Sequence, residues 1–248
     1  MAQALKNNKN CNLTAHVFDI NALSDQQKQD MFALYFQYYE ATSAEKFLAD
    51  LAGKDQVIVL YDRLNILRGF SSLKYIKQQF NGQDCQIIFS GDTIIHHHFW
   101  GEQSLAFCWL RRAGEIKAER PDIPLYYLLI VKGHRTYRLL QAFTCQYYPH
   151  WQTLTPPSIQ AIMNTLGNTL FPHNYQVESG LIHFPVSQGQ LRSQWAEPSP
   201  QAQSRPEVDF FLQKNPGFRQ GDELLCFTEL SSQNFRPLAR RVFESGMK

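Results

Sequence analysis

The chain has 248 residues, of which 44% are hydrophobic and 19% are charged. This composition is typical of a globular protein and excludes a disordered or collagen-like chain. Lys and Arg total 24 and Asp and Glu total 22, so the formal net charge is only +2. Such a balance argues against binding of nucleic acid through bulk charge, because proteins of that kind usually carry a strongly basic face or tail.

The cysteines and the N-terminal residues bear on the compartment. The five cysteines are scattered and form no C-x-x-C pair, a pattern that predicts neither a disulfide framework nor a cysteine-based zinc site. Residues 1–12 are polar, lack the apolar stretch of a signal peptide and are expected to be a frayed tail. The longest apolar run, 125–131, is too short to cross a bilayer. We therefore expect a cytoplasmic protein without a transmembrane segment.

The first part of the chain predicts two helices and a run of antiparallel strands. A short strand is expected at 16–20, and a serine or aspartate at 24–25 can cap the helix that follows. A second helix, 43–52, ends at Gly53. β-branched and apolar segments separated by turns, one of them Asn81-Gly82, predict strands at 56–61, 66–76 and 85–98.

The pattern changes after residue 98. Residues 104–119 place apolar side chains along one helical face and predict a helix. Residues 125–131 are uniformly apolar, as in a strand that is buried on both faces, and a further helix is expected at 136–147. The order of elements up to residue 150 is therefore β-α-α-β-β-β-α-β-α, which predicts a mixed α/β fold.

The last hundred residues give a weaker signal. Residues 185–206 hold four prolines and many Gln and Ser, and predict a long loop that is mobile or forms a lid. The other expected elements are a helix at 157–170, strands at 181–184, 210–212 and 223–230, and a terminal helix at 237–243. We expect an N-terminal core, 13–150, and a C-terminal extension, 151–248, that packs on it.

The element order up to residue 150 resembles that of the GNAT superfamily of N-acyltransferases. The resemblance is carried by a strand (87–98), a loop around Gly101, a helix from Ser104 and the buried strand at 125–131. It implies a GNAT-like mixed, mostly antiparallel sheet flanked by helices. It also implies that two neighbouring strands diverge near residue 101 and that a thioester arm lies in the slot between them. The expected reaction is transfer of an acyl group from acyl-CoA to an amine.

In this family the loop carries Q/R-x-x-G-x-G/A, and its backbone N–H groups bind the CoA pyrophosphate at a helix N-terminus. In the corresponding window, His98-Phe99-Trp100-Gly101-Glu102-Gln103, only the first glycine of the motif agrees, so the loop is degenerate. A carrier protein presents acyl-phosphopantetheine without the nucleotide, which makes an acyl carrier protein an alternative donor. The residues that the resemblance implies as donor contacts are Phe99, Trp100, Gly101, Gln103, Ser104 and Arg135.

The strand at 85–98 supplies candidate catalytic groups. Asp92, His96 and His98 are expected on one face of it and His97 on the other. The family often has a carboxylate base here, which implies Asp92, and His96 can act as a base or water relay because imidazole titrates near neutrality. The alternative is that the histidines only fill a strand end. No third ligand with diagnostic spacing accompanies them, so the sequence predicts no metal site.

Two further residues are candidates by position. Tyr147 stands at the end of the helix expected at 136–147, where the family often has a tyrosine that protonates the departing thiolate; a buried amphipathic tyrosine is the alternative. Arg135 belongs to a small basic cluster after the buried strand. This cluster can contact a CoA phosphate or the acidic surface of a carrier protein, or it can be a solvated helix start.

The sequence thus favours a GNAT-like acyltransferase that moves an acyl group from acyl-CoA or acyl carrier protein to a small-molecule amine. The aromatic content of 13% favours a roomy or apolar acceptor pocket. A non-catalytic GNAT-like protein that binds a ligand or a partner is the alternative. A third hypothesis is an unrelated fold in which the C-terminal half completes one continuous sheet.

Overall fold

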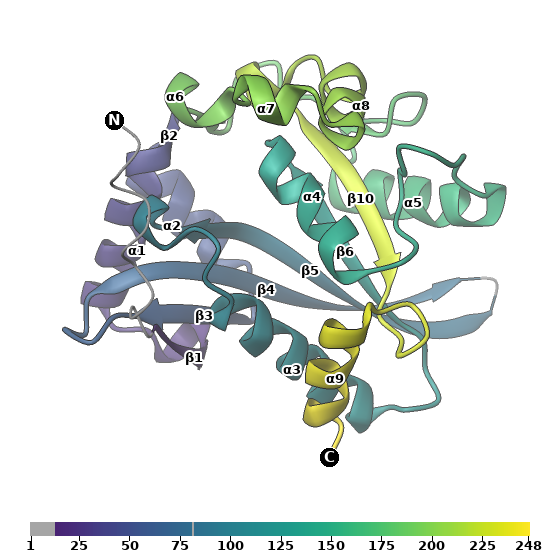
Figure 1. Cartoon of the computed structure of the whole chain (residues 1–248), viewed down its shortest axis with the longest axis horizontal. Coiled ribbons are helices and arrows are strands. Elements are labelled where there is room, and N and C mark those ends of the chain that lie inside the picture. The colour runs from purple at the N-terminus through teal and green to yellow at the C-terminus, as the bar shows by residue number, and fades with distance from the viewer. Residues whose placement is uncertain (1–12, 81) are drawn as a thin grey trace.

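The computed structural model describes residues 13–80 and 82–248. The expected N-terminal tail and Asn81 of the expected turn lie outside this part of the chain. An eight-stranded sheet crosses the molecule in the order β1-β3-β4-β5-β6-β10-β8-β7 (Figure 1). Its neighbouring strands pair antiparallel, except for the parallel pair of β5 and β6. The mixed, mostly antiparallel sheet expected from the sequence is confirmed.

The elements of the described chain have the following bounds. The strands of the large sheet are β1 (Thr14–Asp19), β3 (Gln56–Tyr61), β4 (Leu67–Phe80), β5 (Gln83–Ile95), β6 (Leu125–Val131), β7 (Tyr175–Gln176), β8 (Leu181–Ile182) and β10 (Glu223–Glu229). A separate two-stranded ladder joins β2 (Tyr39–Glu40) and β9 (Gln190–Leu191). The helices are α1 (Asp25–Tyr38), α2 (Ala44–Ala52), α3 (Ser104–Glu119), α4 (His134–Phe143), α5 (Pro157–Leu170), α6 (Ser193–Ala196), α7 (Pro200–Gln203), α8 (Pro206–Lys214) and α9 (Pro237–Gly246). Short 3₁₀ turns are η1 (Ile20–Ala22), η2 (His97–Phe99) and η3 (Phe218–Gln220).

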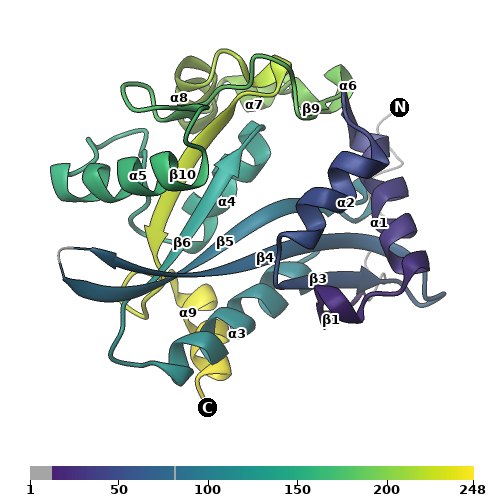
Figure 2. The same cartoon turned by 180° about the vertical axis from the view of Figure 1, so that it is seen from behind.

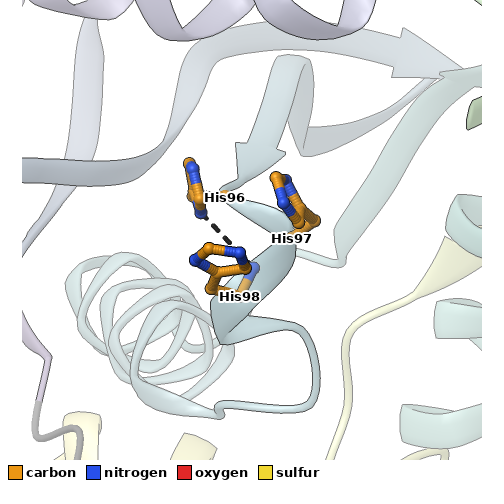
Figure 3. Close-up of side chains that lie close together, drawn as sticks. All are labelled: His96, His97 and His98. Carbon is orange, nitrogen blue, oxygen red and sulfur yellow. Dashed lines mark hydrogen bonds between the residues drawn. The ribbon is translucent and has the colours of Figure 1, made fainter. Parts of the chain in front are cut away.

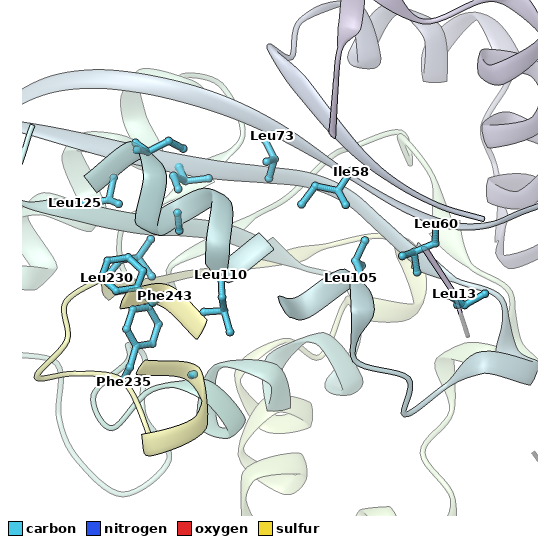
Figure 4. Packing of buried hydrophobic residues seen from close by; sticks show 14 residues of the cluster. Leu13, Ile58, Leu60, Leu73, Leu105, Leu110, Leu125, Leu230, Phe235 and Phe243 are labelled. Carbon is cyan, nitrogen blue, oxygen red and sulfur yellow. The ribbon is translucent and has the colours of Figure 1, made fainter. Parts of the chain in front are cut away.

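Helices cover both faces of the sheet, which explains why the central strands are apolar on both sides. Val57 and Val59 of β3 pack under α1 and α2, whereas Ile58 and Leu60 face α3 and α9. This alternation follows from the two-residue period of a strand. Figure 4 shows the second cluster, in which Leu110 and Phe243 and their neighbours fill the space beneath the sheet. Further along the sheet, α5 lies on the α1 side and α4 on the α3 side (Figures 1 and 2).

The C-terminal residues contribute directly to the large sheet. Strand β10 pairs antiparallel with β6, so that Leu224 lies opposite Val131 and Glu229 opposite Tyr126. On its other side β10 pairs with β8. Residues that follow position 150 therefore lie in the same sheet as β5 and β6, next to the place where those two strands meet.

Several local expectations are wrong in instructive ways. The apolar triplet at 210–212, expected as a strand, belongs to α8, in which the buried Val208 and Phe211 are three residues apart on one helical face. Residues 185–206, expected as a long loop, contain β9, α6 and α7. The helix expected at 136–147 is α4, which starts earlier, at His134, and already ends at Phe143. Within the described ranges, no helix combines the length and apolar character needed to span a bilayer.

Candidate functional site

A cleft opens where β5 and β6 separate. The two strands pair in parallel only between Gln86–Ser90 and Leu125–Leu129, although β5 continues to Ile95 and β6 to Val131. The expected divergence of two neighbouring strands is thus confirmed, and it begins after Ser90. The cleft has a volume of about 440 Å³ and is lined by the ends of both strands, by α1 and α2, and by part of the segment 184–195.

Asp92 lies in this cleft on a β-bulge of β5. Ser71 pairs with Thr93 and Leu73 with Ser90, so two β5 residues, Gly91 and Asp92, face the one intervening β4 residue. A bulge bends the strand and changes the direction of its side chains. Position 91 is closely packed, because a Cβ there would lie 2.6 Å from both Ser72 Oγ and Lys54 Cε, and these side chains would have to move.

The Asp92 carboxylate has no hydrogen bond and no ion pair with any other residue that the structure describes. Burial raises the pKa of Asp92 to about 6, and the positive charges of Lys132 and Lys54 oppose this rise. At neutral pH the group is therefore mostly ionised, yet more basic than an ordinary aspartate. An unpartnered, moderately basic carboxylate in a cleft can accept a proton from a bound substrate.

Two ion pairs flank Asp92. Lys132, which directly follows β6, has its Nζ 3.4 Å from a carboxylate oxygen of Glu223 at the start of β10, and both side chains are buried. Lys54 Nζ lies 2.6 Å from the carboxylate of Asp50 on α2. Both lysines thus have a carboxylate partner of their own, and Asp92 is left as the unpaired acid of the cleft.

Tyr35 near the end of α1 and Tyr39 at the start of β2 form a wall of the cleft. The rings of Tyr35 and Tyr39 stack with centroids 4.4 Å apart, and Lys132 Nζ lies 5.5 Å from the centre of the Tyr39 ring. Burial raises the pKa of both hydroxyls, and the negative charge of Asp92 adds to this effect. The two phenols therefore remain protonated at neutral pH and can act as hydrogen-bond donors.

The segment after β8 closes one side of the cleft. Strand β9 pairs with β2, and the Arg192 N–H donates to the Tyr38 carbonyl. Trp195 of α6 packs against Trp100, with ring centroids 5.4 Å apart, and also lines the cleft. The Arg135 guanidinium stacks 4.8 Å from the Trp100 ring centre and donates a hydrogen bond to the Trp195 carbonyl.

In the loop expected to bind the donor pyrophosphate, the backbone N–H of Ser104 already donates a hydrogen bond to a side chain of the same loop. The Glu102 carboxylate accepts hydrogen bonds from the Ser104 N–H (2.7 Å) and from the Ser104 hydroxyl (2.6 Å) at the start of α3. Gly101 has a positive φ of +94°, and no atom lies within 4 Å of a Cβ built there. Of the expected donor contacts, Trp100 and Arg135 line the cleft, whereas Phe99, Gly101, Gln103 and Ser104 do not.

The three histidines do not lie on a strand, so their expected arrangement on its two faces is wrong. Strand β5 ends at Ile95, and the chain turns into η2, where the Phe99 N–H donates to the His96 carbonyl. The dashed line in Figure 3 marks the hydrogen bond that the His98 N–H donates to His96 Nδ1. Burial and the neighbouring histidines lower the pKa of His96 to about 4. His96 does not line the cleft, and the structure does not bring it together with Asp92 as a second base.

The same histidines lie close to one another. Their potential ligand atoms are within 4.8 Å of each other, and His97 Nδ1 lies 3.0 Å from the Tyr38 hydroxyl. Nitrogen ligands of a tetrahedral zinc ion lie roughly 3.4 Å apart, given Zn–N distances of about 2.0–2.1 Å. The imidazole rings would therefore have to rotate before they could share an ion.

Tyr147 is placed away from the cleft. Because α4 ends at Phe143, the chain turns before residue 147, and the Tyr147 side chain is only 1% exposed. Its ring packs against Tyr137 and His150, with centroids 5.8 and 4.6 Å away. The structure therefore does not bring Tyr147 together with Asp92.

Among the residues of the cleft, sequence reasoning did not single out Tyr35, Tyr39 or Glu223, and it considered Lys132 only as part of the basic cluster after the buried strand. Tyr35 and Tyr39 are four residues apart, the spacing that places side chains on one helical face, but the same spacing is equally typical of core residues. Glu223 is a charged residue at the start of an apolar strand, a weak signal of a buried partner. Nothing local in the sequence indicates that Glu223 pairs with Lys132.

No protein-family model matches the sequence. No curated protein matches it either. Among solved structures, an Enterococcus faecalis protein named "Probable N-Acyltransferase" aligns with a TM-score of 0.39 and 16% identity, over 54% of this chain and 33% of that one. The N-acetyltransferase YhbS of Escherichia coli, in complex with CoA, aligns with a TM-score of 0.37 and 14% identity, over 53% of this chain and 69% of that one.

The N-myristoyltransferase of Saccharomyces cerevisiae with bound myristoyl-CoA aligns with a TM-score of 0.36 and 12% identity, over 48% of this chain and 29% of that one. The matched part thus spans about a third of the Enterococcus and yeast chains. At such scores and identities none of these alignments assigns a substrate or an activity to this chain. Its own topology is a mostly antiparallel sheet with one parallel pair, β5 and β6, that is joined through α3 and splays open, which is the sheet that the resemblance noted in the sequence implies.

Proposed function

We propose that this protein is an N-acyltransferase that moves an acyl group from a thioester to an amine, with Asp92 as the base. The observation that carries the proposal is the unpartnered Asp92 carboxylate, which lies on a bulge at the point where β5 and β6 separate.

The described cysteines, Cys85, Cys108, Cys145 and Cys226, are free, in keeping with a reducing cytoplasm.

The proposed reaction needs one base and one acid. Asp92 accepts a proton from the amine as the amine nitrogen attacks the thioester carbonyl carbon and the C–N bond forms. The tetrahedral intermediate then collapses, the C–S bond breaks, and the thiolate takes a proton. Tyr147 is the acid that the sequence suggests, but it does not line the cleft. Tyr35 and Tyr39 line it and are close enough to Asp92 for its charge to raise the pKa of both hydroxyls, so we assign the acid role to one of these two.

The donor is acyl-CoA or acyl-phosphopantetheine carried by a protein. The Glu102 carboxylate already accepts the Ser104 N–H and adds a negative charge where a pyrophosphate would have to bind. This contact favours a donor that lacks the nucleotide, and hence an acyl carrier protein. Trp100, which lines the cleft, remains a proposed contact of the pantetheine arm, whereas Phe99, Gly101 and Gln103 would contact the donor outside the cleft.

The base is tested by replacement of Asp92 with Asn, with Asp84→Asn as the matched control. Asp84 is an exposed carboxylate on the same strand and does not line the cleft. Thiol release from acetyl-CoA, octanoyl-CoA and octanoyl carrier protein is measured with a panel of amines. We expect Asp92→Asn to lower kcat by roughly 10²- to 10⁴-fold, the range for loss of a general base. An active Asp92→Asn enzyme would exclude Asp92 as the base.

The Glu102 contact also favours a second candidate, a non-catalytic protein of the same fold that binds a ligand or a partner. A donor at 100 times its dissociation constant stabilises a protein by about 2.7 kcal/mol, which thermal unfolding detects readily. The enzyme hypothesis predicts such a stabilisation by at least one acyl-CoA or acyl carrier protein. If no donor stabilises the protein and none is consumed, the non-catalytic function is the better explanation.

A further inference from the structure

The charged groups that line the cleft do not balance within the protein. Lys54 pairs with Asp50 and Lys132 with Glu223, and each pair is electrically neutral. The charged lining residues that remain are Asp92 on one side and Arg135 and Lys46 on the other. Among the ion pairs of the described chain, none involves any of these three residues. The cleft therefore offers one free carboxylate and two free cations to whatever occupies it.

Arg135 is exposed, as Lys46 is, but its guanidinium contacts other residues at the edge of the cleft. Its guanidinium stacks on Trp100 and donates one hydrogen bond to the Trp195 carbonyl, which leaves other N–H groups of the fork able to donate to a ligand. No carboxylate of the described chain forms an ion pair with Arg135. A bound anion can therefore form charge-assisted hydrogen bonds with the N–H groups that remain.

We infer that the acceptor amine carries an anionic group, a carboxylate or a phosphate, that binds Arg135 while its amino group meets Asp92. Such a molecule is zwitterionic: its positive charge is complementary to the one free carboxylate, and its negative charge is complementary to one of the two free cations. The inference rests on the proposed function. It implies that Arg135 binds the acceptor rather than the donor. Lys46, which is exposed on α2, adds to the positive charge at the same cleft.

The test compares matched pairs that differ by the anionic group: L-leucine with 3-methylbutylamine, L-phenylalanine with 2-phenylethylamine, and O-phosphoethanolamine with ethanolamine. Binding to the full-length protein is measured by calorimetry and thermal shift, without any need for turnover. A charge-assisted contact predicts that the anionic member of at least one pair binds about 10- to 100-fold more tightly. The pairs also distinguish a carboxylate from a phosphate.

Variants identify the residue responsible. Arg135→Met keeps an apolar stem against Trp100 but removes the charge, and it should reduce the difference within a pair to less than about threefold, because the remaining contacts of the two members are the same. Arg135→Lys should restore part of the difference. Arg111→Gln, which removes an exposed cation of α3 outside the cleft, should leave it unchanged.

Three results would overturn the inference: equal binding of both members of every pair, no binding of either member at millimolar concentration, or an Arg135→Met variant that weakens only acyl-CoA. The last of these results would show that Arg135 binds the donor and not the acceptor. Thiol release is then measured with the same pairs. If the zwitterions bind through Arg135 but no donor acylates them, the inference about the site holds and the proposed acyl transfer fails.

Discussion

Replacement of Asp92 by Asn should make the protein more stable while it removes activity. Burial raises the pKa of Asp92 from 3.8 to about 6, so the folded protein binds this proton more tightly than the unfolded chain does. Below about pH 3.8 the group is protonated in both states and does not change the free energy of unfolding. As the pH rises through 6 the folded state has to hold an ionised, desolvated carboxylate, and stability is lost.

The size of the effect follows from the size of the pKa difference. A rise from 3.8 to about 6 corresponds to about 3 kcal/mol of unfolding free energy, as an upper value, at pH 7 and above. Asn has nearly the same shape and no charge, so the Asp92→Asn substitution should raise the free energy of unfolding by up to this amount. For a chain of this length, about 3 kcal/mol corresponds to a rise in Tm of roughly 6–12 °C.

Urea unfolding and calorimetry at pH 7.5 and at pH 3.5 provide the measurement. The Asp92→Asn variant should exceed the natural sequence in stability at pH 7.5, and this advantage should vanish at pH 3.5. Asp84→Asn serves as the control and should change little at either pH, because its carboxylate is exposed. A lower Tm for Asp92→Asn at pH 7.5 would show that the carboxylate is stabilised by contacts and would refute the argument from burial.

Three other outcomes are expected. If Asp92 is the base, kcat/KM should fall as the pH drops through about 6, since the protonated acid cannot accept a proton; a profile that stays flat down to pH 5 would exclude it. Gly114→Ala should lower stability by roughly 1–3 kcal/mol in urea unfolding, although Ala favours helices by about 1 kcal/mol, because the new Cβ would overlap the Phe243 carbonyl of α9; an unchanged midpoint would refute this close approach. Glu102→Ala should free the Ser104 N–H and strengthen acetyl-CoA binding about tenfold in calorimetry, and unchanged affinity would rule out this helix end as a phosphate site.

Elements with a long and regular apolar pattern could be predicted from the sequence nearly to the residue. The helices α3 and α5 and the strands β3 and β6 have the expected bounds. Each is defined by information within its own segment. Helical spacing marks α3, proline stands at the first position of α5, and β6 is a continuous apolar run. These features act over a few residues and need no knowledge of the rest of the fold.

Expectations failed where a short pattern depends on its neighbours. Three apolar residues at 210–212 are compatible with a strand or a helix, and the packing of Val208 and Phe211 in the core decides for the helix. The expected position of Tyr147 depends on a helix that in fact ends at Phe143. Just beyond that end, the Cys145 N–H donates to the Asn234 carbonyl, far along the chain. This contact is set by tertiary structure rather than by local sequence.

The site itself shows most clearly what a linear sequence hides. Asp92 is identifiable because a strand residue beside a degenerate loop is a local signal, but its chemistry depends on Lys132 and Glu223, which are brought together by the pairing of β6 with β10. Because the two strands are antiparallel and Leu224 lies opposite Val131, Glu223, which precedes Leu224, lies beside Lys132, which follows Val131. A carboxylate that neutralises Lys132 leaves Asp92 with less positive charge nearby and so keeps it basic. The last strand of the chain therefore sets the basicity of a residue 131 positions earlier, and a truncated chain without β10 would lose the site along with the strand.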